Sequence, residues 1–109
     1  MLYILHVDSI EGVRPLRVIG THKVDDFIRK HPDSDGWLKS WLAEARSGKW
    51  QSPNEIKKRY KSASVLDDKR VIFNVKGNNY RMEIQVSYKN QIVVIKRIGT
   101  HAEYNRWDS

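Results

Sequence analysis

Three runs of alternating apolar and polar side chains in the second half of the chain constrain its fold most. They cover residues 70–76, 80–88 and 91–98. A period of two is typical of β-strands that bury one face. The runs are separated by residues that favour tight turns, Gly77-Asn78 and Lys89-Asn90, and such turns join antiparallel neighbours. This half of the chain therefore predicts a three-stranded antiparallel meander.

The two turns also predict a register if their central residues are the pairs just named. The first hairpin then sets Asn74 opposite Arg81. The second sets Glu83 opposite Lys96. These four polar residues share one face of the sheet, which we expect to carry the functional site. The other face gathers the apolar residues of the same strands: Phe73, Met82, Ile84, Val93 and Ile95.

Arg97 falls on the apolar face in this register. Its side chain would have to reach solvent along apolar surface, or a β-bulge near Gly99 would have to turn it away. The same register sets Arg81 opposite Ile98. It sets Tyr80 opposite Gly99, at the end of the third strand.

The first half of the chain predicts a short strand followed by helices. The strand covers residues 16–20, and a helix follows at about residues 23–30. Thr21 can cap this helix, which we expect to end before Pro32 because proline disfavours helical backbone in the residue that precedes it.

Two further helices are predicted before the meander. One runs from about residue 35 to residue 47, with Asp33 or Ser34 as its cap and Gly48 as its end. It carries one apolar stripe, which we expect to lie on the sheet: Trp37, Leu38, Trp41, Leu42 and Ala45. The other starts at Ser52-Pro53 and reaches about residue 60. The expected fold class is α+β: the three-stranded meander plus an N-terminal strand in one antiparallel sheet, with two to three helices on one face.

The length of the chain, 109 residues, fits a single domain. We expect that domain to cover residues 16–109 and to follow an N-terminal extension, residues 1–15, that holds a possible strand over residues 2–7. No stretch approaches the roughly 20 apolar residues of a membrane span. The N-terminus lacks a basic lead and a small-residue cleavage site. We therefore expect a cytoplasmic protein that contacts no membrane.

The chain contains no cysteine, which removes disulfides, thiolate nucleophiles and thiolate metal sites. Its four histidines are spread along the sequence without the short spacing of a local zinc site: His6, His22, His31 and His101. We expect neither a metal nor a cofactor.

The net charge of +7 lies in one half of the chain. Residues 1–48 hold seven Lys/Arg and seven Asp/Glu, whereas residues 49–109 hold thirteen against six. Such an excess favours a polyanionic partner, either a nucleic acid or an acidic protein, although a solvated basic surface would look the same. Lys57, Lys58 and Arg59 on the third helix are open to both interpretations.

A capping box is predicted directly after the last strand, where Glu103 follows Thr100 by three residues. A helical turn there would put His101 and Tyr104 on one face. They would lie at the end of the strand next to Arg81, beside backbone donors that favour a phosphate. The tetrapeptide Ile-Gly-Thr-His occurs here and at residues 19–22, but four residues are too few to indicate a duplication.

Two segments of the meander resemble the HigB-type toxins of the RelE-like superfamily. They are Val71-Ile72-Phe73-Asn74-Val75-Lys76-Gly77-Asn78-Asn79-Tyr80-Arg81 and Ile98-Gly99-Thr100-His101-Ala102-Glu103-Tyr104. They look like the signatures FNxxGNxxR and GTHxEY. The segments 50–53 and 62–66 also look like family segments, and the resemblance spans about residues 16–104, leaving residues 1–15 outside the pattern.

The resemblance implies a RelE-like fold and cleavage of messenger RNA, usually on translating ribosomes. It also implies a type II toxin–antitoxin system with a helix-turn-helix antitoxin of the HigA type. By position, the first motif assigns functional roles to Asn74, Asn78 and Arg81, and the second to Thr100, His101 and Tyr104.

Metal-independent RNA cleavage needs a base for the 2′-hydroxyl, cations for the charged phosphorane and an acid for the leaving oxygen. His101 suits the acid and base roles, because imidazole changes charge near neutral pH. Arg81 suits the phosphate, and Tyr104 can stack on a base or assist proton transfer. The candidate RNA-binding residues are Asn74, Lys76, Asn78, Lys96, Lys57, Lys58 and Arg59.

Two other functions compete with this hypothesis. A ParE-like toxin on the same fold would block a protein target such as gyrase without catalysis, and it would have no use for the imidazole of His101. A plain RNA-binding module would need aromatic residues on the exposed sheet face. The predicted register buries Phe73 and Tyr80 instead, which counts against such a module.

Overall fold

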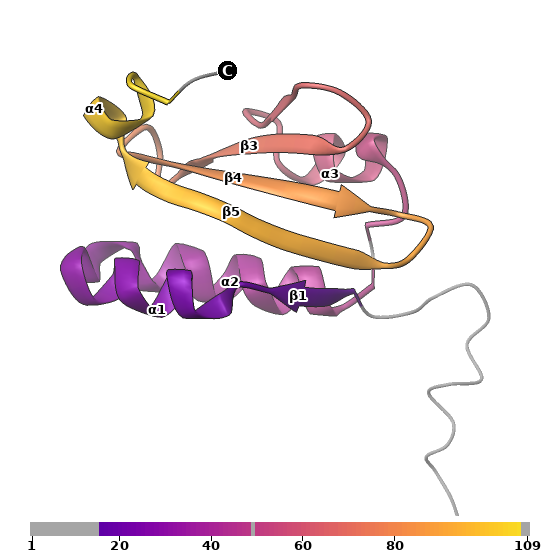
Figure 1. The fold of residues 1–109 in the computed structure, drawn as a ribbon, viewed down its shortest axis with the longest axis horizontal. Helices are drawn as coiled ribbons and strands as arrows, with labels where there is room; N and C mark the ends of the chain where they lie inside the picture. The colour runs from indigo at the N-terminus through magenta and orange to yellow at the C-terminus, as the bar shows by residue number, and fades with distance from the viewer. Residues whose placement is uncertain (1–15, 49, 108–109) are drawn as a thin grey trace, which may run out of the picture.

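A computed structural model describes residues 16–48 and 50–107 of the chain (Figure 1). The elements follow in the order β1 (Arg17–Ile19), α1 (Thr21–Lys30), the 3-10 helix η2 (Pro32–Ser34), α2 (Asp35–Arg46), α3 (Pro53–Arg59), β2 (Ser64–Val65), β3 (Arg70–Val75), β4 (Tyr80–Ser87), β5 (Ile92–Thr100) and α4 (His101–Tyr104). The predicted strand over residues 2–7 and the extension that contains it lie outside the described residues.

The strands of the described residues form one mixed sheet in the order β1-β5-β4-β3-β2. The meander β3-β4-β5 is antiparallel, as predicted, and β2 adds a further antiparallel strand beside β3. The prediction that the N-terminal strand is antiparallel is wrong, because β1 pairs with β5 in parallel. A three-residue strand at a sheet edge carries too short a pattern to set its direction. The fold class is α+β.

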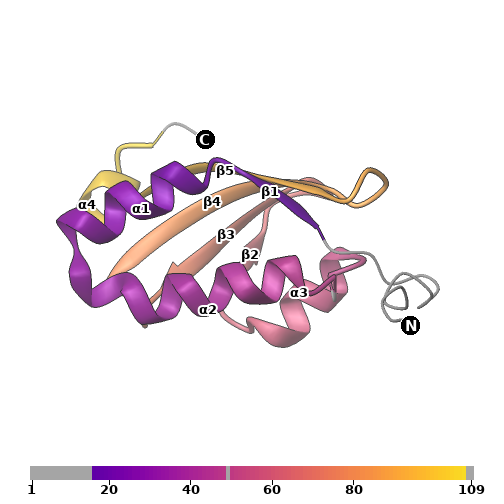
Figure 2. The same cartoon turned by 90° about the horizontal axis from the view of Figure 1, so that it is seen from below.

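Two long helices, α1 and α2, cover one face of the sheet, whereas α4 lies on its other side (Figures 1 and 2). The core between helices and sheet is aromatic: Trp41 and Trp50 are buried, and each contacts the ring of Phe73 on β3. Ile56 of α3 joins the same core. The predicted stripe on α2 packs here, with Leu38, Trp41 and Ala45 buried and Trp37 and Leu42 partly buried.

The helix ends show which caps form. Ser52 caps α3 as predicted, because its side chain accepts a hydrogen bond from the N–H of Glu55. Thr21 does not cap α1: Gly20 is the N-cap, with a φ of 94°, and Thr21 is already helical. Ser34 occupies the N-cap position of α2, one of the two predicted, but its hydroxyl donates back to the carbonyl of His31, 2.7 Å away, and makes no capping bond to the helix.

The first hairpin has the predicted register, with Asn74 opposite Arg81. The second hairpin has the predicted register only in the part next to its turn, from Ser87 to Ile84, and Ile84 lies opposite Ile95. Beyond that point a β-bulge inserts an additional residue into β5, and the predicted pairs of this end are wrong. Glu83 pairs with Arg97 instead of Lys96, Arg81 with Gly99 instead of Ile98, and Tyr80 with Thr100 instead of Gly99.

The bulge therefore exchanges the places of two basic residues. Arg97 lies opposite Glu83 on the sheet face that α1 and α2 leave uncovered, which we call the open face. A bulge is one of the two explanations that the sequence suggested for Arg97, although the observed bulge lies at Lys96 and not near Gly99. A bulge turns the side chains that follow it to the opposite face of the strand. Arg97, and not Lys96, is therefore the basic residue of β5 on the polar face.

Candidate functional site

A capping box holds the short helix α4 at the end of β5. The hydroxyl of Thr100 accepts from the N–H of Glu103 at 3.1 Å, and the carboxylate of Glu103 accepts from the N–H of Thr100 at 2.8 Å. The backbone N–H of Thr100 is the main cause that lowers the pKa of Glu103. The predicted cap is confirmed, and it fixes the direction in which the side chains of α4 point.

The rings of His101 and Tyr104 lie on neighbouring positions of α4, with centroids 6.2 Å apart. The guanidinium carbon of Arg81 on β4 is 5.3 Å from the centroid of Tyr104, a cation–π contact. The imidazole of His101 is exposed. Residues from both sequence motifs thus meet at one end of the open face.

The β3–β4 turn orients the guanidinium of Arg81, a residue that is 9% exposed as a whole. Its Nη1 donates to the carbonyl oxygens of Asn78 and Tyr80, both at 3.2 Å, and its Nη2 donates to the Oδ1 of Asn78 at 3.3 Å. Asn78 therefore holds the side chain of Arg81 in place by accepting two hydrogen bonds from it. A guanidinium has more donors than these bonds use, so Arg81 can also donate to a phosphate.

Two residues beside these side chains, Arg97 and Trp107, were not predicted from the sequence as site residues. The guanidinium of Arg97 donates to Glu83 at 2.8 Å and lies 4.5 Å from the ring centroid of Trp107. Trp107 contacts Tyr104 edge to face, with centroids 5.3 Å apart. The spacing of Ile95 and Ile98 could have indicated that Arg97 lies on the polar face. Two core-facing residues three positions apart in a strand require a bulge between them.

An open cavity of about 360 Å³ lies among these side chains on the open face. Arg70, Glu83 and Arg97 contribute its charged groups, and Tyr104 and Trp107 its aromatic rings. The cavity adjoins the cluster of Arg81 and His101, because Tyr104 belongs to both.

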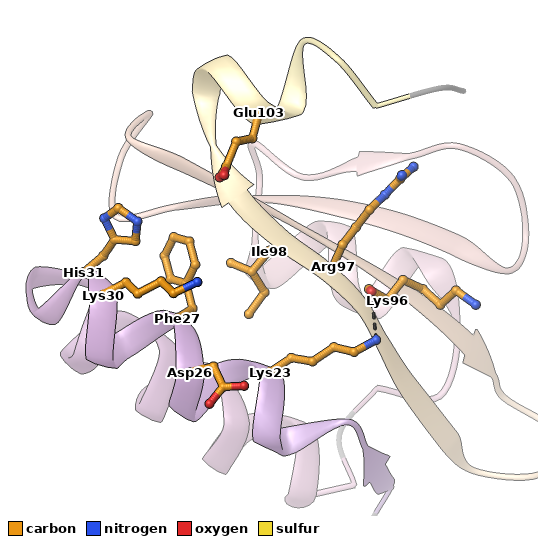
Figure 3. A pocket seen from close by; sticks show the side chains of 9 residues that line it. All are labelled: Lys23, Asp26, Phe27, Lys30, His31, Lys96, Arg97, Ile98 and Glu103. Carbon is orange, nitrogen blue, oxygen red and sulfur yellow. Dashed lines mark hydrogen bonds between the residues drawn. The ribbon is translucent and has the colours of Figure 1, made fainter.

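Lys96 lies apart from this cluster, in a second cavity of about 340 Å³ between α1 and β5 (Figure 3). The carbonyl oxygen of Lys96 accepts from the Nζ of Lys23 at 3.0 Å, and Lys30 and His31 also line the cavity. Figure 3 shows Arg97 extending away from α1. The sequence predicted that Lys96 shares a face with Glu83, and the bulge makes that prediction wrong.

The other candidates of the β3 region lie close to the cluster without joining it. Asn74 is the neighbour of Arg81 across the strands, and its side-chain amide donates to the carbonyl of Ser62 at 3.4 Å. Lys76 begins the β3–β4 turn and pairs with Asp33 beside the helices, at 3.7 Å.

The basic residues of α3 do not approach the cluster, since α3 and α4 lie toward opposite ends of the molecule (Figures 1 and 2). Lys57 donates to the carbonyls of Lys61 and Ala63, both at 2.7 Å, and so closes the end of its own helix. Arg59 forms an ion pair of 2.7 Å with Glu44 of α2. Lys58 is exposed.

Glu44 also accepts from the hydroxyl of Tyr60 at 3.0 Å. Burial of Tyr60 and this carboxylate raise the pKa of its hydroxyl. Two of the three basic residues of α3 therefore have a local structural role.

Within residues 16–48 and 50–107, no three His, Asp or Glu side chains gather in a group that could hold a metal ion. No helix in the same described ranges is long and apolar enough to cross a membrane.

Comparison with known proteins agrees with the two motifs. A family model described as HigB_toxin, the RelE-like toxic component of a toxin-antitoxin system, matches residues 34–107. The mRNA interferase toxin HigB of Escherichia coli (strain K12) is 26% identical over 92 residues, which span 83% of this chain and 88% of the relative. The proteins named mRNA interferase HigB of Escherichia coli O157:H7 and Shigella flexneri are similar to the same extent. Because the family match spans most of the chain and includes both motifs, this chain belongs to the HigB family of RelE-like toxins.

Proposed function

We propose that this chain is the toxin of a type II toxin–antitoxin system and acts as an endoribonuclease on translated messenger RNA. The relatives named mRNA interferase support the substrate class. The net charge of +7 suits a polyanionic substrate. One observation carries the proposal: Arg81 of the first motif and His101 of the second both contact Tyr104, so the two motifs converge at α4.

Cleavage proceeds by attack of the 2′-hydroxyl on the adjacent phosphorus. The 2′-oxygen forms the new bond, the bond to the 5′-oxygen breaks, and the proton lost by the 2′-hydroxyl is matched by one gained by the leaving oxygen. His101 is the residue proposed to exchange these protons, because its imidazole is exposed at the first position of α4.

Arg81 is proposed to stabilise the negative charge of the phosphorane. Its guanidinium is already oriented by Asn78, so it need not be reorganised during the reaction. Tyr104 covers that guanidinium and offers a ring to a base or a hydroxyl to a proton transfer. Asn74 lies next to Arg81 and can contact the RNA backbone.

The remaining lysines suit contacts farther along the RNA or on the ribosome. Lys58 and Lys96 are exposed cations, and Lys76 lies at the exposed β3–β4 turn. Lys57 and Arg59 are committed to local contacts, so they are the weakest RNA-binding candidates. The partners in this proposal are messenger RNA, the ribosome and a helix-turn-helix antitoxin, and the place of action is the cytoplasm.

The test compares two exposed histidines that follow the same three residues, Ile-Gly-Thr. His101→Ala should lower the rate of message cleavage by about 10² to 10⁴, the usual cost of losing an acid–base group. His22→Ala on α1 should leave it unchanged. Cleavage is measured by mapping new RNA 5′ ends in a translation extract supplied with purified protein.

Full cleavage by the His101→Ala protein would exclude the proposed catalytic role. Intact messages together with inhibited DNA supercoiling would instead favour a ParE-like block of gyrase.

A further inference from the structure

The carboxylate of Glu83 is buried on the open face, and the proposed chemistry does not use it. Its side chain is 8% exposed, although it lies on the sheet face that no long helix covers. One of its oxygens accepts from Arg97 at 2.8 Å. A carboxylate can accept several hydrogen bonds and donates none when it is charged. Glu83 is thus a fixed acceptor at the base of the open-face cavity.

Flat side chains form part of the walls of this cavity, beside the aliphatic Leu66 and Ile72. The guanidinium of Arg97 lies 4.5 Å from the ring centroid of Trp107, and Tyr104 meets Trp107 edge to face at 5.3 Å. RNA-binding proteins stack unpaired bases on aromatic rings and on arginine planes. The volume of about 360 Å³ lies within the range of small-molecule sites.

Tyr104 connects the cavity to the proposed catalytic cluster. It lines the cavity and also covers the guanidinium of Arg81, 5.3 Å from its ring centroid. A nucleotide adjacent to a phosphate held by Arg81 would therefore have the cavity beside it.

We propose that this cavity binds a guanine base next to the scissile phosphate, with its Watson–Crick edge on Glu83. Guanine presents two neighbouring donors on that edge, N1–H and the 2-amino group, which match the two oxygens of a carboxylate. Adenine, cytosine and uracil lack this pair of adjacent donors. Asn105 also lines the cavity, and its amide can donate to the O6 of guanine.

This inference rests on the proposed ribonuclease function, and its test separates the two. Messages with a single cleavage site carry guanosine at the flanking position, or inosine, which lacks only the 2-amino group, or another base. The wild-type protein should cleave the guanosine message about ten times or more faster than the inosine message, as expected for a bidentate contact to a base.

Glu83→Gln should bring the rates for guanosine and inosine close to each other, because a glutamine side chain has only one acceptor oxygen for the two donors of guanine. Glu55→Gln removes the same charge from an exposed position on α3 and should keep the full preference. Circular dichroism and the melting temperature of each variant report whether it is folded. Trp107→Leu provides a second variant and should raise KM for the guanosine message more than it lowers kcat.

Equal rates on guanosine and inosine in the wild type would overturn the guanine site while the ribonuclease function stands. A guanosine preference that survives Glu83→Gln would also overturn it, and would leave the pair with Arg97 a purely structural role. Absence of cleavage on every message would overturn both proposals.

Discussion

The tetrapeptide Ile-Gly-Thr-His occurs at residues 19–22 and 98–101, and the two copies fold differently. Each leads from a strand into a helix, and the two strands, β1 and β5, are parallel neighbours. In the first copy Gly20 is the N-cap, in the left-handed region at a φ of 94°, and the helix starts at the threonine. In the second copy the threonine is the N-cap, and the helix starts one residue later.

The residue three positions after each threonine explains the difference. Glu103 follows Thr100 and closes a capping box with it. Val24 follows Thr21, and it is fully buried in the core. The first copy therefore starts a packed helix, whereas the second starts a short exposed helix whose histidine meets Tyr104. The same four residues lead into a helix that packs on the core in one place, and into the helix of the candidate site in the other.

Alanine at the two glycines should separate these roles most strongly. Gly20→Ala places a side chain at a positive φ, with its Cβ 3.0 Å from the carbonyl oxygen of Ile95. We expect this variant to lose about 1 to 3 kcal/mol of unfolding free energy, because alanine is strained in that conformation. The measurement is chemical denaturation followed by circular dichroism.

Gly99→Ala is the matched control. Its Cβ would meet side chains only, those of Glu103 and Trp107 at 3.0 to 3.1 Å. These side chains can move, so the loss of unfolding free energy should be smaller, while α4 is displaced and message cleavage falls. An equal or greater loss of stability at Gly99 would show that the second copy also supports the core.

Alanine at the two threonines should have a smaller effect. Thr100→Ala removes the cap of α4, and loss of an N-cap typically costs about 1 kcal/mol. Thr21→Ala removes no capping bond, because Thr21 lies inside α1, and it should change the unfolding free energy by less than about 0.5 kcal/mol. The denaturation midpoints of the two variants give this difference directly. A greater loss for Thr21→Ala would contradict the assignment of Gly20 as the cap.

Much of the meander could be predicted because its local signals agree with its packing. The first hairpin has the expected register, since its turn residues and its apolar alternation point to the same pairing. The capping box at Thr100 was predictable for a similar reason: both partners lie within one turn of helix. The contact of Arg81 with Tyr104 then followed from a motif in each segment.

The second hairpin could be predicted only as far as Ile84, because the bulge interrupts the period of two. Its effect on the site is large, since it puts Arg97 where Lys96 was expected. The parallel pairing of β1 with β5 depends on how α1 packs against the sheet, which no local pattern reports. Trp107 lies three residues beyond Tyr104, after both motifs have ended, and only its contacts in the folded chain, with Arg97 and Tyr104, identify it as part of the site.

Lowering the pH should produce the smallest of these differences between the two copies of the tetrapeptide. Hydrogen bonds from Thr100 hold the pKa of Glu103 below its ordinary value of 4.5. A lowered pKa means that the charged form stabilises the fold at higher pH, and that this stabilisation is lost as the pH falls below 4.5 and through the folded value. The amide signal of Thr100 in nuclear magnetic resonance spectra should shift with that titration. In Glu103→Gln this shift of the Thr100 signal should disappear. The amide signal of Thr21, which is not in a capping box, should have the same pH dependence in the variant as in the wild type. A Thr100 signal that still titrates in Glu103→Gln would mean that another carboxylate holds α4, and that the residue three positions on does not decide how the two copies differ.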